Sequence, residues 1–234
     1  MSVACVVTGR NRGASDLKPT LLPLVHLVGV AHTVAAGEAA SSLRGLIVFH
    51  ERLAPYMTRL DPLQSLPDIL EPGLSVVFCG INPGMSAAST GRHFAGRNNR
   101  FWRTLHLAGF TPEEIRPEDD RTLLRHGCGL TTAVSRATTR ADQLSKWEFS
   151  AAAADFEHKI EQYAPQCIAF LGKMALSAMT GKREIHWGQQ AAAFGGARAW
   201  VLPNPSGLNR SFSLDALVVA YRELRLAIAT AGSA

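Results

Sequence analysis

Short apolar runs alternate with amphipathic segments along residues 66–234. Buried strands are predicted where such runs are uninterrupted and bounded by turn residues, at 74–80, 128–134, 166–172 and 198–203. Helices are predicted where apolar side chains recur at helical spacing or helix-boundary residues flank a segment, at 98–109, 145–163, 173–181 and 213–230. Strands that alternate with helices favour a parallel sheet with helices on both faces. We therefore expect an α/β fold of three layers, α/β/α, with a short, mainly parallel central sheet.

Two of the predicted helices have specific sequence signals. Ser145 and Glu148 have the spacing of a capping box, and Pro165 stops the segment that they begin. The last predicted helix has one apolar face, made of Leu214, Leu217, Val218, Tyr221, Leu224 and Ile228. Such a face packs against a sheet or another helix, so this segment is expected to close the fold.

Residues 1–65 do not follow this pattern. The apolar run at 21–36 is too short for a membrane span and is interrupted by Pro23, His26 and His32. A basic start followed by an apolar run weakly resembles a signal peptide. We expect instead a poorly ordered extension outside the core, or a gene start placed too early, because Met57 offers an internal initiator. We assign the segment no function and expect one domain at 66–234.

Composition and cysteine spacing narrow the class of protein. With 47% hydrophobic and 18% charged residues in 234, the chain is globular, and its net charge of +5 suits a polyanionic partner without specifying one. The four cysteines (Cys5, Cys79, Cys128 and Cys167) form no CxxC pair, so they predict neither a zinc site nor a disulfide framework. We interpret the last three as core residues in a reducing compartment. We expect no metal, no cofactor and no membrane contact.

Two polar loops follow predicted strands and are the candidate functional segments. One is Gly-Ile-Asn-Pro-Gly-Met at 80–85, and the other is Pro-Asn-Pro-Ser-Gly-Leu-Asn-Arg at 203–210. Ligands of parallel α/β sheets bind at the carboxyl ends of the strands, where both loops are expected. Either loop alone is typical of a turn, because Asn-Pro and Ser-Gly are common turn dipeptides.

Together the two loops resemble the active-site motifs of the uracil-DNA glycosylase superfamily. The resemblance is closest to the mismatch-specific, thymine-DNA glycosylase-like branch of this superfamily. The segments that resemble it are 76–84, 99–102, 128–129, 145–146, 171–173, 187–188 and 200–208. It implies a monofunctional DNA glycosylase of base excision repair, which hydrolyses the N-glycosidic bond of uracil flipped out of mismatched double-stranded DNA and leaves an abasic site. Thymine and modified cytosines are further candidate substrates.

The resemblance implies a role for each motif residue. Asn82 would position the attacking water, although an amide cannot accept its proton at neutral pH. Phe94 would stack on the flipped base, and Asn204 would donate a hydrogen bond to it. Gly84 has no side chain to exclude the methyl group of thymine. The implied base pocket is Gly80, Ile81, Pro83, Gly84, Phe94 and Asn204.

The second loop would enter the DNA. Leu208 would fill the gap left by the flipped nucleotide, and Arg210 would bind the widowed guanine or a phosphate. Lys173 is expected to meet phosphate near a helix N-terminus. The implied DNA-binding set is Lys173, Ser206, Gly207, Leu208, Asn209 and Arg210. The partner would be double-stranded DNA with a G·U or related mismatch, bound by a monomer in the cytoplasm at the nucleoid.

The sequence departs from the family pattern at two places. Relatives can have serine where Ala87 and Asn209 stand here, which leaves hydrogen bonds near the pocket, and hence the substrate range, open. Acidic residues that could assist or replace Asn82 are Asp119, Asp120 and Asp142. We interpret those three, together with His93 and His186, as solvated surface residues.

Two other functions stay open at this point. The first alternative is a non-catalytic mismatch- or lesion-binding protein. A slow enzyme that retains its product behaves much like such a binder, and the amide of Asn82 is consistent with slow chemistry. A nucleoside hydrolase would act on free nucleosides and ignore the opposing base, and the pair Leu208 and Arg210 argues against it. No lysine occupies a motif position suited to Schiff-base chemistry, so no strand cleavage is expected.

Overall fold

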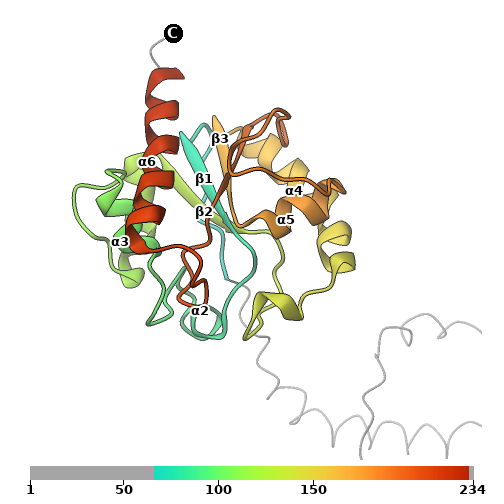
Figure 1. Cartoon of the computed structure of the whole chain (residues 1–234), viewed down its shortest axis with the longest axis horizontal. Coiled ribbons are helices and arrows are strands. Elements are labelled where there is room, and N and C mark those ends of the chain that lie inside the picture. The colour runs from blue at the N-terminus through green and yellow to red at the C-terminus, as the bar shows by residue number, and fades with distance from the viewer. Residues whose placement is uncertain (1–65, 232–234) are drawn as a thin grey trace, which may run out of the picture. The chain divides into compact units, whose positions relative to one another are not determined.

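One five-stranded sheet forms the centre of the fold (Figure 1). The structure is a computed structural model that describes residues 66–231, and the extension predicted at 1–65 lies outside them. The strands are β1 (Val76–Gly80), β2 (Cys128–Thr132), β3 (Cys167–Leu171), β4 (Gly188–Gln189) and β5 (Arg198–Leu202), in the order β2-β1-β3-β5-β4. All neighbouring strands are parallel except β4, which pairs antiparallel with β5 at the edge. The mainly parallel sheet is therefore confirmed.

Helices cover both faces of this sheet. They are α2 (Met85–Thr90), α3 (Phe101–Leu107), α4 (Lys146–Tyr163), α5 (Lys173–Thr180) and α6 (Leu214–Ala231), with 3₁₀ helices η1 (Pro117–His126) and η2 (Ala141–Gln143). In Figure 1, α3 and α6 lie on one side of the sheet, and α4 and α5 lie on the other. The predicted three-layer α/β/α architecture is confirmed.

The alternation of side chains along β1 explains the two layers. Phe78 packs with Phe101 and Tyr221 in the core on one face, whereas Val77 packs with Phe170 in the core on the other. Successive residues of a strand point to opposite faces, so a strand buried on both sides is apolar throughout. This is why the central strands were visible in the sequence as continuous apolar runs.

Helix α3 is shorter than the predicted helix at 98–109. It begins at Phe101, and Arg100 precedes it as the N-cap residue. The backbone N–H of Arg100 donates to Pro205 O at 3.0 Å. Residues 98–100 therefore pack against the loop after β5 instead of extending the helix.

The cysteines within 66–231 are buried free thiols, as predicted. Burial raises the pKa of Cys128 and of Cys167 to about 12 and the pKa of Cys79 further, so all three thiols stay protonated at neutral pH. Over the same residues, no group of His, Cys, Asp or Glu side chains is placed to hold a metal ion, and no helix is long and apolar enough to cross a membrane.

Candidate active site

Three loops that follow parallel strands converge at the carboxyl edge of the sheet. A Cβ atom placed on Gly172, at the end of β3, would lie 3.7 Å from Ile81 Cδ1 and 3.8 Å from Asn204 Cβ. Gly172 itself has a φ of +111°, a conformation that side-chain-bearing residues rarely adopt. The loops after β1, β3 and β5 thus meet around a glycine that the local backbone requires.

Asn82 is held in one orientation by the segment after β2. Its Nδ2 atom donates to Arg136 O at 2.8 Å and to Thr138 Oγ1 at 2.7 Å. A backbone carbonyl can only accept, so the NH₂ group of the amide must face this segment. The Oδ1 atom is turned away from this segment, and within the described part of the chain, 66–231, it accepts no hydrogen bond, so it can accept one from a water molecule.

The backbone of the Asn82 loop is fixed by the same segment. Gly80 O, Ile81 O and Pro83 O accept hydrogen bonds from the backbone N–H groups of residues 133, 134 and 138 at 2.9, 3.1 and 3.1 Å. Gly84 forms an isolated parallel bridge with Thr138, whose side chain is buried. Thr138 is a site residue that sequence reasoning missed, because nothing in the spacing links it to a loop 56 residues earlier.

Gly84 is the N-cap residue of α2 and faces open space. A Cβ atom added there would have no neighbour within 4 Å, and its φ of −74° is accessible to any residue. Neither the backbone nor the packing of the fold therefore requires glycine at this position.

Phe94 lies at the end of β1, close to Gly80. Its ring stacks on the ring of Phe101 with centroids 3.9 Å apart, and its Cζ atom is 3.7 Å from where a Gly80 Cβ would stand. Its φ of 54° is unusual for a residue with a side chain. With one face of the ring covered by Phe101, Phe94 can offer only the opposite face to a ligand.

The residue before Phe94 is buried, which makes the prediction of a solvated His93 wrong. His93 is 1% exposed, and its Nε2 atom lies 2.9 Å from Pro67 O. Its backbone N–H donates to Asp120 Oδ2 at 3.1 Å, and its carbonyl accepts from Trp102 Nε1 at 3.2 Å. Burial lowers the pKa of His93. These contacts hold the backbone that gives Phe94 its conformation.

Asp120 is likewise buried and not solvated as predicted. It is 2% exposed and pairs with Arg92 at 3.1 Å in addition to the His93 backbone. Asp119 and Asp142 are exposed, as predicted, and Asp142 pairs with Arg140 at 2.6 Å. Asp120 thus anchors the segment that carries Phe94. The hydrogen bonds of Asn82 found within 66–231 involve none of these three acidic residues.

The loop after β5 presents an exposed leucine on an ordered backbone. Leu208 is 73% exposed, and Arg210 is also exposed. Asn209 Nδ2 donates to Asn204 O at 2.8 Å, and Ser206 Oγ accepts from the backbone N–H of Leu208 at 3.3 Å. The predicted set at 204–210 is therefore one hydrogen-bonded turn with Leu208 at its tip.

The side chain of Asn204 is oriented by its own loop. Its Oδ1 atom accepts from the backbone N–H of Ser206 at 2.9 Å, which is an Asx turn. The NH₂ group must then face the other way. Among residues 66–231 no acceptor is found for Nδ2, which leaves it as a donor beside Gly172.

Arg100 and Gly207 join this loop to the segment before α3. The guanidinium of Arg100 donates to the backbone carbonyls of four loop residues, namely 205, 206, 209 and 212. A Cβ atom on Gly207 would lie 2.5 Å from Asn98 O, so only glycine allows this close approach. Sequence reasoning assigned no role to Arg100, although it lies within a stretch that resembles the family.

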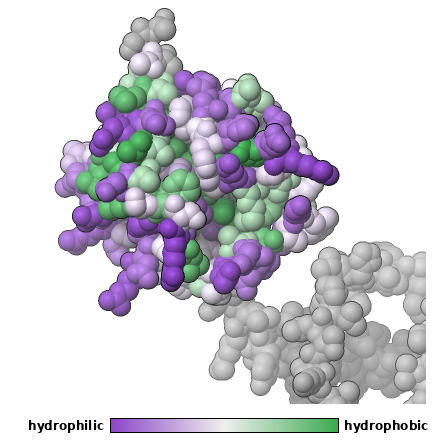
Figure 2. Space-filling model, viewed as in Figure 1, coloured by the Kyte–Doolittle hydropathy of each residue, from purple (hydrophilic) through white to green (hydrophobic). Residues whose placement is uncertain are grey.

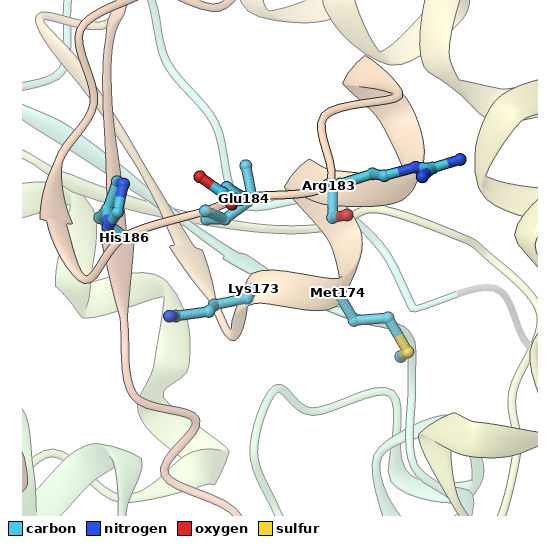
Figure 3. A pocket seen from close by; sticks show the side chains of 7 residues that line it. Lys173, Met174, Arg183, Glu184 and His186 are labelled. Atoms are coloured by element: carbon cyan, nitrogen blue, oxygen red, sulfur yellow. The ribbon is translucent and has the colours of Figure 1, made fainter.

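Lys173 lies in the first turn of α5, beside a surface hollow of about 530 Å³. Figure 3 shows its side chain extending towards His186, in the direction opposite to Met174, with Arg183 and Glu184 on the segment across the hollow. Its Nζ atom lies 4.6 Å from the ring centroid of Trp187. His186 is exposed, as predicted.

The lower edge of the molecule in Figure 1, where α2 lies, carries mainly polar side chains. Figure 2 shows hydrophilic residues projecting there around a small apolar patch. Helix α2 directly follows β1, so this edge includes the loop of Asn82.

Comparison with known proteins identifies the family. The model of the uracil DNA glycosylase superfamily matches residues 67–225. A solution NMR structure of a protein from Methanosarcina acetivorans, described as a candidate uracil DNA glycosylase, is similar at 21% sequence identity and a TM-score of 0.47, over 69% of this chain and 98% of that chain. Because the family model spans more than half of the sequence, including both motif loops, the chain belongs to the uracil DNA glycosylase superfamily.

Proposed function

We propose that this chain is a monofunctional DNA glycosylase that hydrolyses the N-glycosidic bond of uracil flipped out of mismatched double-stranded DNA. The observation that carries the proposal is the fixed amide of Asn82, whose Nδ2 atom is held by Arg136 O and Thr138 Oγ1, while no donor to Oδ1 is found among residues 66–231. A water bound to Oδ1 would have its lone pairs directed away from the amide and towards a sugar carbon at the carboxyl edge. Superfamily membership supports the same reaction class.

The chemistry of this site relies on position and electrostatics. Cleavage of the bond gives an oxocarbenium-like sugar and an anionic base, and an amide takes no proton from the attacking water. Stabilisation of the departing base must then supply much of the rate enhancement. The free Nδ2 donor of Asn204 beside Gly172 suits that task. We expect slow turnover, an abasic product and an intact strand, because water is the nucleophile.

Base extrusion is assigned to the β5 loop and to Phe94. The exposed side chain of Leu208 enters the base stack, and Arg210 binds the widowed base or a phosphate. The extruded uracil stacks on the face of Phe94 that Phe101 leaves open. The mismatch contributes to selection, because a poorly paired base costs less to unstack.

The mismatch-specific, thymine-DNA glycosylase-like branch is part of this proposal. It is supported by the open space at Gly84, where no side chain stands against a methyl group on the base. Thymine and modified cytosines are then candidate substrates beside uracil.

The test is excision from an end-labelled duplex that carries one G·U pair, followed by alkali. The parent protein should give alkali-dependent cleavage, and Asn82→Ala should lower the rate by about 10²-fold, because loss of positioning at a reacting centre costs that much. Ser89→Ala, on the exposed surface of α2, should retain the parent rate.

The other outcomes separate the alternatives. Cleavage that survives in Asn82→Ala moves the water-positioning role to another residue. A parent protein that shifts the mismatched duplex in a gel but never cleaves it, on G·U or on single-stranded uracil, favours the non-catalytic mismatch- or lesion-binding protein. Activity on free nucleosides with no preference for the opposing base would favour a nucleoside hydrolase.

A further inference from the structure

Arg100 donates hydrogen bonds to four backbone carbonyls of the loop that carries Leu208. Nε contacts Pro205 O at 3.3 Å, and Nη1 contacts Phe212 O at 2.6 Å. Nη2 contacts both Ser206 O at 3.0 Å and Asn209 O at 2.8 Å. The backbone N–H of Arg100 adds a further bond to Pro205 O at 3.0 Å. A single residue before α3 therefore holds most of the turn at 205–212.

The guanidinium group of Arg100 binds these backbone carbonyls and not an acidic side chain. None of the ion pairs found among residues 66–231 includes Arg100. Carbonyl groups that converge on one point repel one another, and a planar cation with five donors satisfies them together. An ammonium group concentrates its donors on one atom, so a lysine there cannot span the same set.

The two bonds to Nη2 flank the tip of the loop. Ser206 and Asn209 enclose Gly207 and Leu208, and both of their carbonyls bond to the same nitrogen. Leu208 is 73% exposed, so packing does little to orient its side chain. The direction in which Leu208 projects is then set by the backbone that Arg100 holds.

We propose that Arg100 is a positioning residue for base extrusion, which keeps Leu208 in place to displace a base from stacked duplex DNA. This inference rests on the proposed function, and Arg100 acts through Leu208 without touching the reacting atoms. Uracil in single-stranded DNA has no paired partner to be separated from. Loss of Arg100 should therefore slow excision from a duplex and leave excision from single-stranded DNA little changed.

The experiment compares kcat/KM on a G·U duplex and on the same strand without its complement. Arg100→Lys and Leu208→Ala should each lower the duplex value by roughly tenfold or more, because unstacking a base costs a few kcal/mol. The double variant should be no slower than the slower single variant, since both changes remove one function. Arg103→Lys is the matched control, because Arg103 lies three residues further on, within α3, and contacts Glu114 instead of the loop.

A second pair of variants tests the loop without altering the charge of Arg100. Gly207→Ala would place a Cβ atom 2.5 Å from Asn98 O and must displace the turn, whereas Gly96→Ala meets nothing within 4 Å. The first should reproduce the duplex-specific loss and the second should not. This pair decides the question if Arg100→Lys proves too unstable to assay.

Equal losses on duplex and single-stranded DNA would overturn the inference, as would additive effects of Arg100→Lys and Leu208→Ala. So would an unchanged duplex rate in Arg100→Lys. A parent protein that cleaves neither substrate would overturn the proposed function instead, which distinguishes the two failures.

Discussion

At the scale of the residue, the glycine at position 84 is expected to determine which bases the protein excises. Its backbone conformation is accessible to any residue, and an added Cβ meets open space. Gly84→Tyr should therefore fold normally and narrow the pocket against a base methyl group. We expect it to retain uracil excision and lower thymine excision about 10- to 200-fold, the range by which a pocket discriminates one methyl group. The measurement is the ratio of kcat/KM for G·U and G·T duplexes.

Gly84→Ala is the control for this substitution. A methyl side chain at residue 84 is too short to reach across the pocket, so both excision rates should stay near those of the parent. A tyrosine variant that keeps the parent ratio would show that residue 84 does not face the base. The prediction requires measurable thymine excision by the parent protein, which the missing side chain at Gly84 favours.

Single residues were predictable from sequence only where a local motif fixes their surroundings. Asn82 and Leu208 lie in motif loops after strands, and both are found at the carboxyl edge. Thr138 was missed, and His93 and Asp120 were wrongly expected to be solvated. Their partners come from distant parts of the chain: Thr138 meets Asn82, and Asp120 meets the His93 backbone. Such contacts depend on tertiary packing, which spacing along the chain does not encode.

At the scale of the element, the segment that carries Phe94 should weaken on acidification. Burial lowers the pKa of His93 from its ordinary value of 6.5 in the unfolded chain. Below that value the unfolded chain binds a proton that the folded chain does not, so this group makes stability fall as the pH falls. His93→Gln can still donate to Pro67 O and does not titrate. Its free energy of unfolding should depend less on pH below about 6.5 than that of the parent.

Urea unfolding of both proteins at several pH values between 7.5 and 5 would test this, with pH values chosen around the ordinary histidine pKa of about 6.5. The difference between parent and variant isolates His93 from the other titrating groups. Parallel pH dependence in the two proteins would mean that His93 takes up its proton in the folded state as easily as in the unfolded one. The burial of His93, which is the largest influence on its pKa and lowers it, argues against that result.

Elements were predictable in proportion to their length and burial. The central strands are apolar throughout because both of their faces are covered, and the capping box at Ser145 marks the start of α4. The sequence analysis missed α2, the two 3₁₀ helices η1 and η2, and β4. Helix α2 has six residues and β4 has two, too few for a period to be visible, and half of the residues of η1 are charged. Residues 98–100 were expected in a helix but bind the β5 loop instead.

At the scale of the whole molecule, five large apolar side chains are exposed among the mainly polar ones of the carboxyl edge of the sheet. Large apolar residues are exposed there on the segments that follow β1, β2, β3 and β5 and on the segment that precedes β4: Met85, Trp147, Met174, Leu208 and Trp187. Of these residues, Leu208 is the one that the proposed function brings into contact with DNA. The positive net charge of the chain adds a general attraction to DNA, but only charges at this edge would contact its phosphates.

Lys173 and Arg125 separate these two effects of charge. Lys173 lies at the carboxyl edge, in the first turn of α5, which has no acidic residue in its first turn. Arg125 is exposed at the opposite edge, just before β2. In the Asn82→Ala background, in which turnover is expected to be about 10²-fold slower, Lys173→Ala should weaken duplex binding and lower the slope of log Kd against log salt by about 0.9, the value for one phosphate contact. Arg125→Ala should leave that slope unchanged, since a charge on the far edge releases no counterion.

Fluorescence anisotropy of a labelled G·U duplex over a range of salt concentrations measures both slopes. Equal changes in the two variants would mean that DNA responds to net charge alone and that Lys173 makes no phosphate contact.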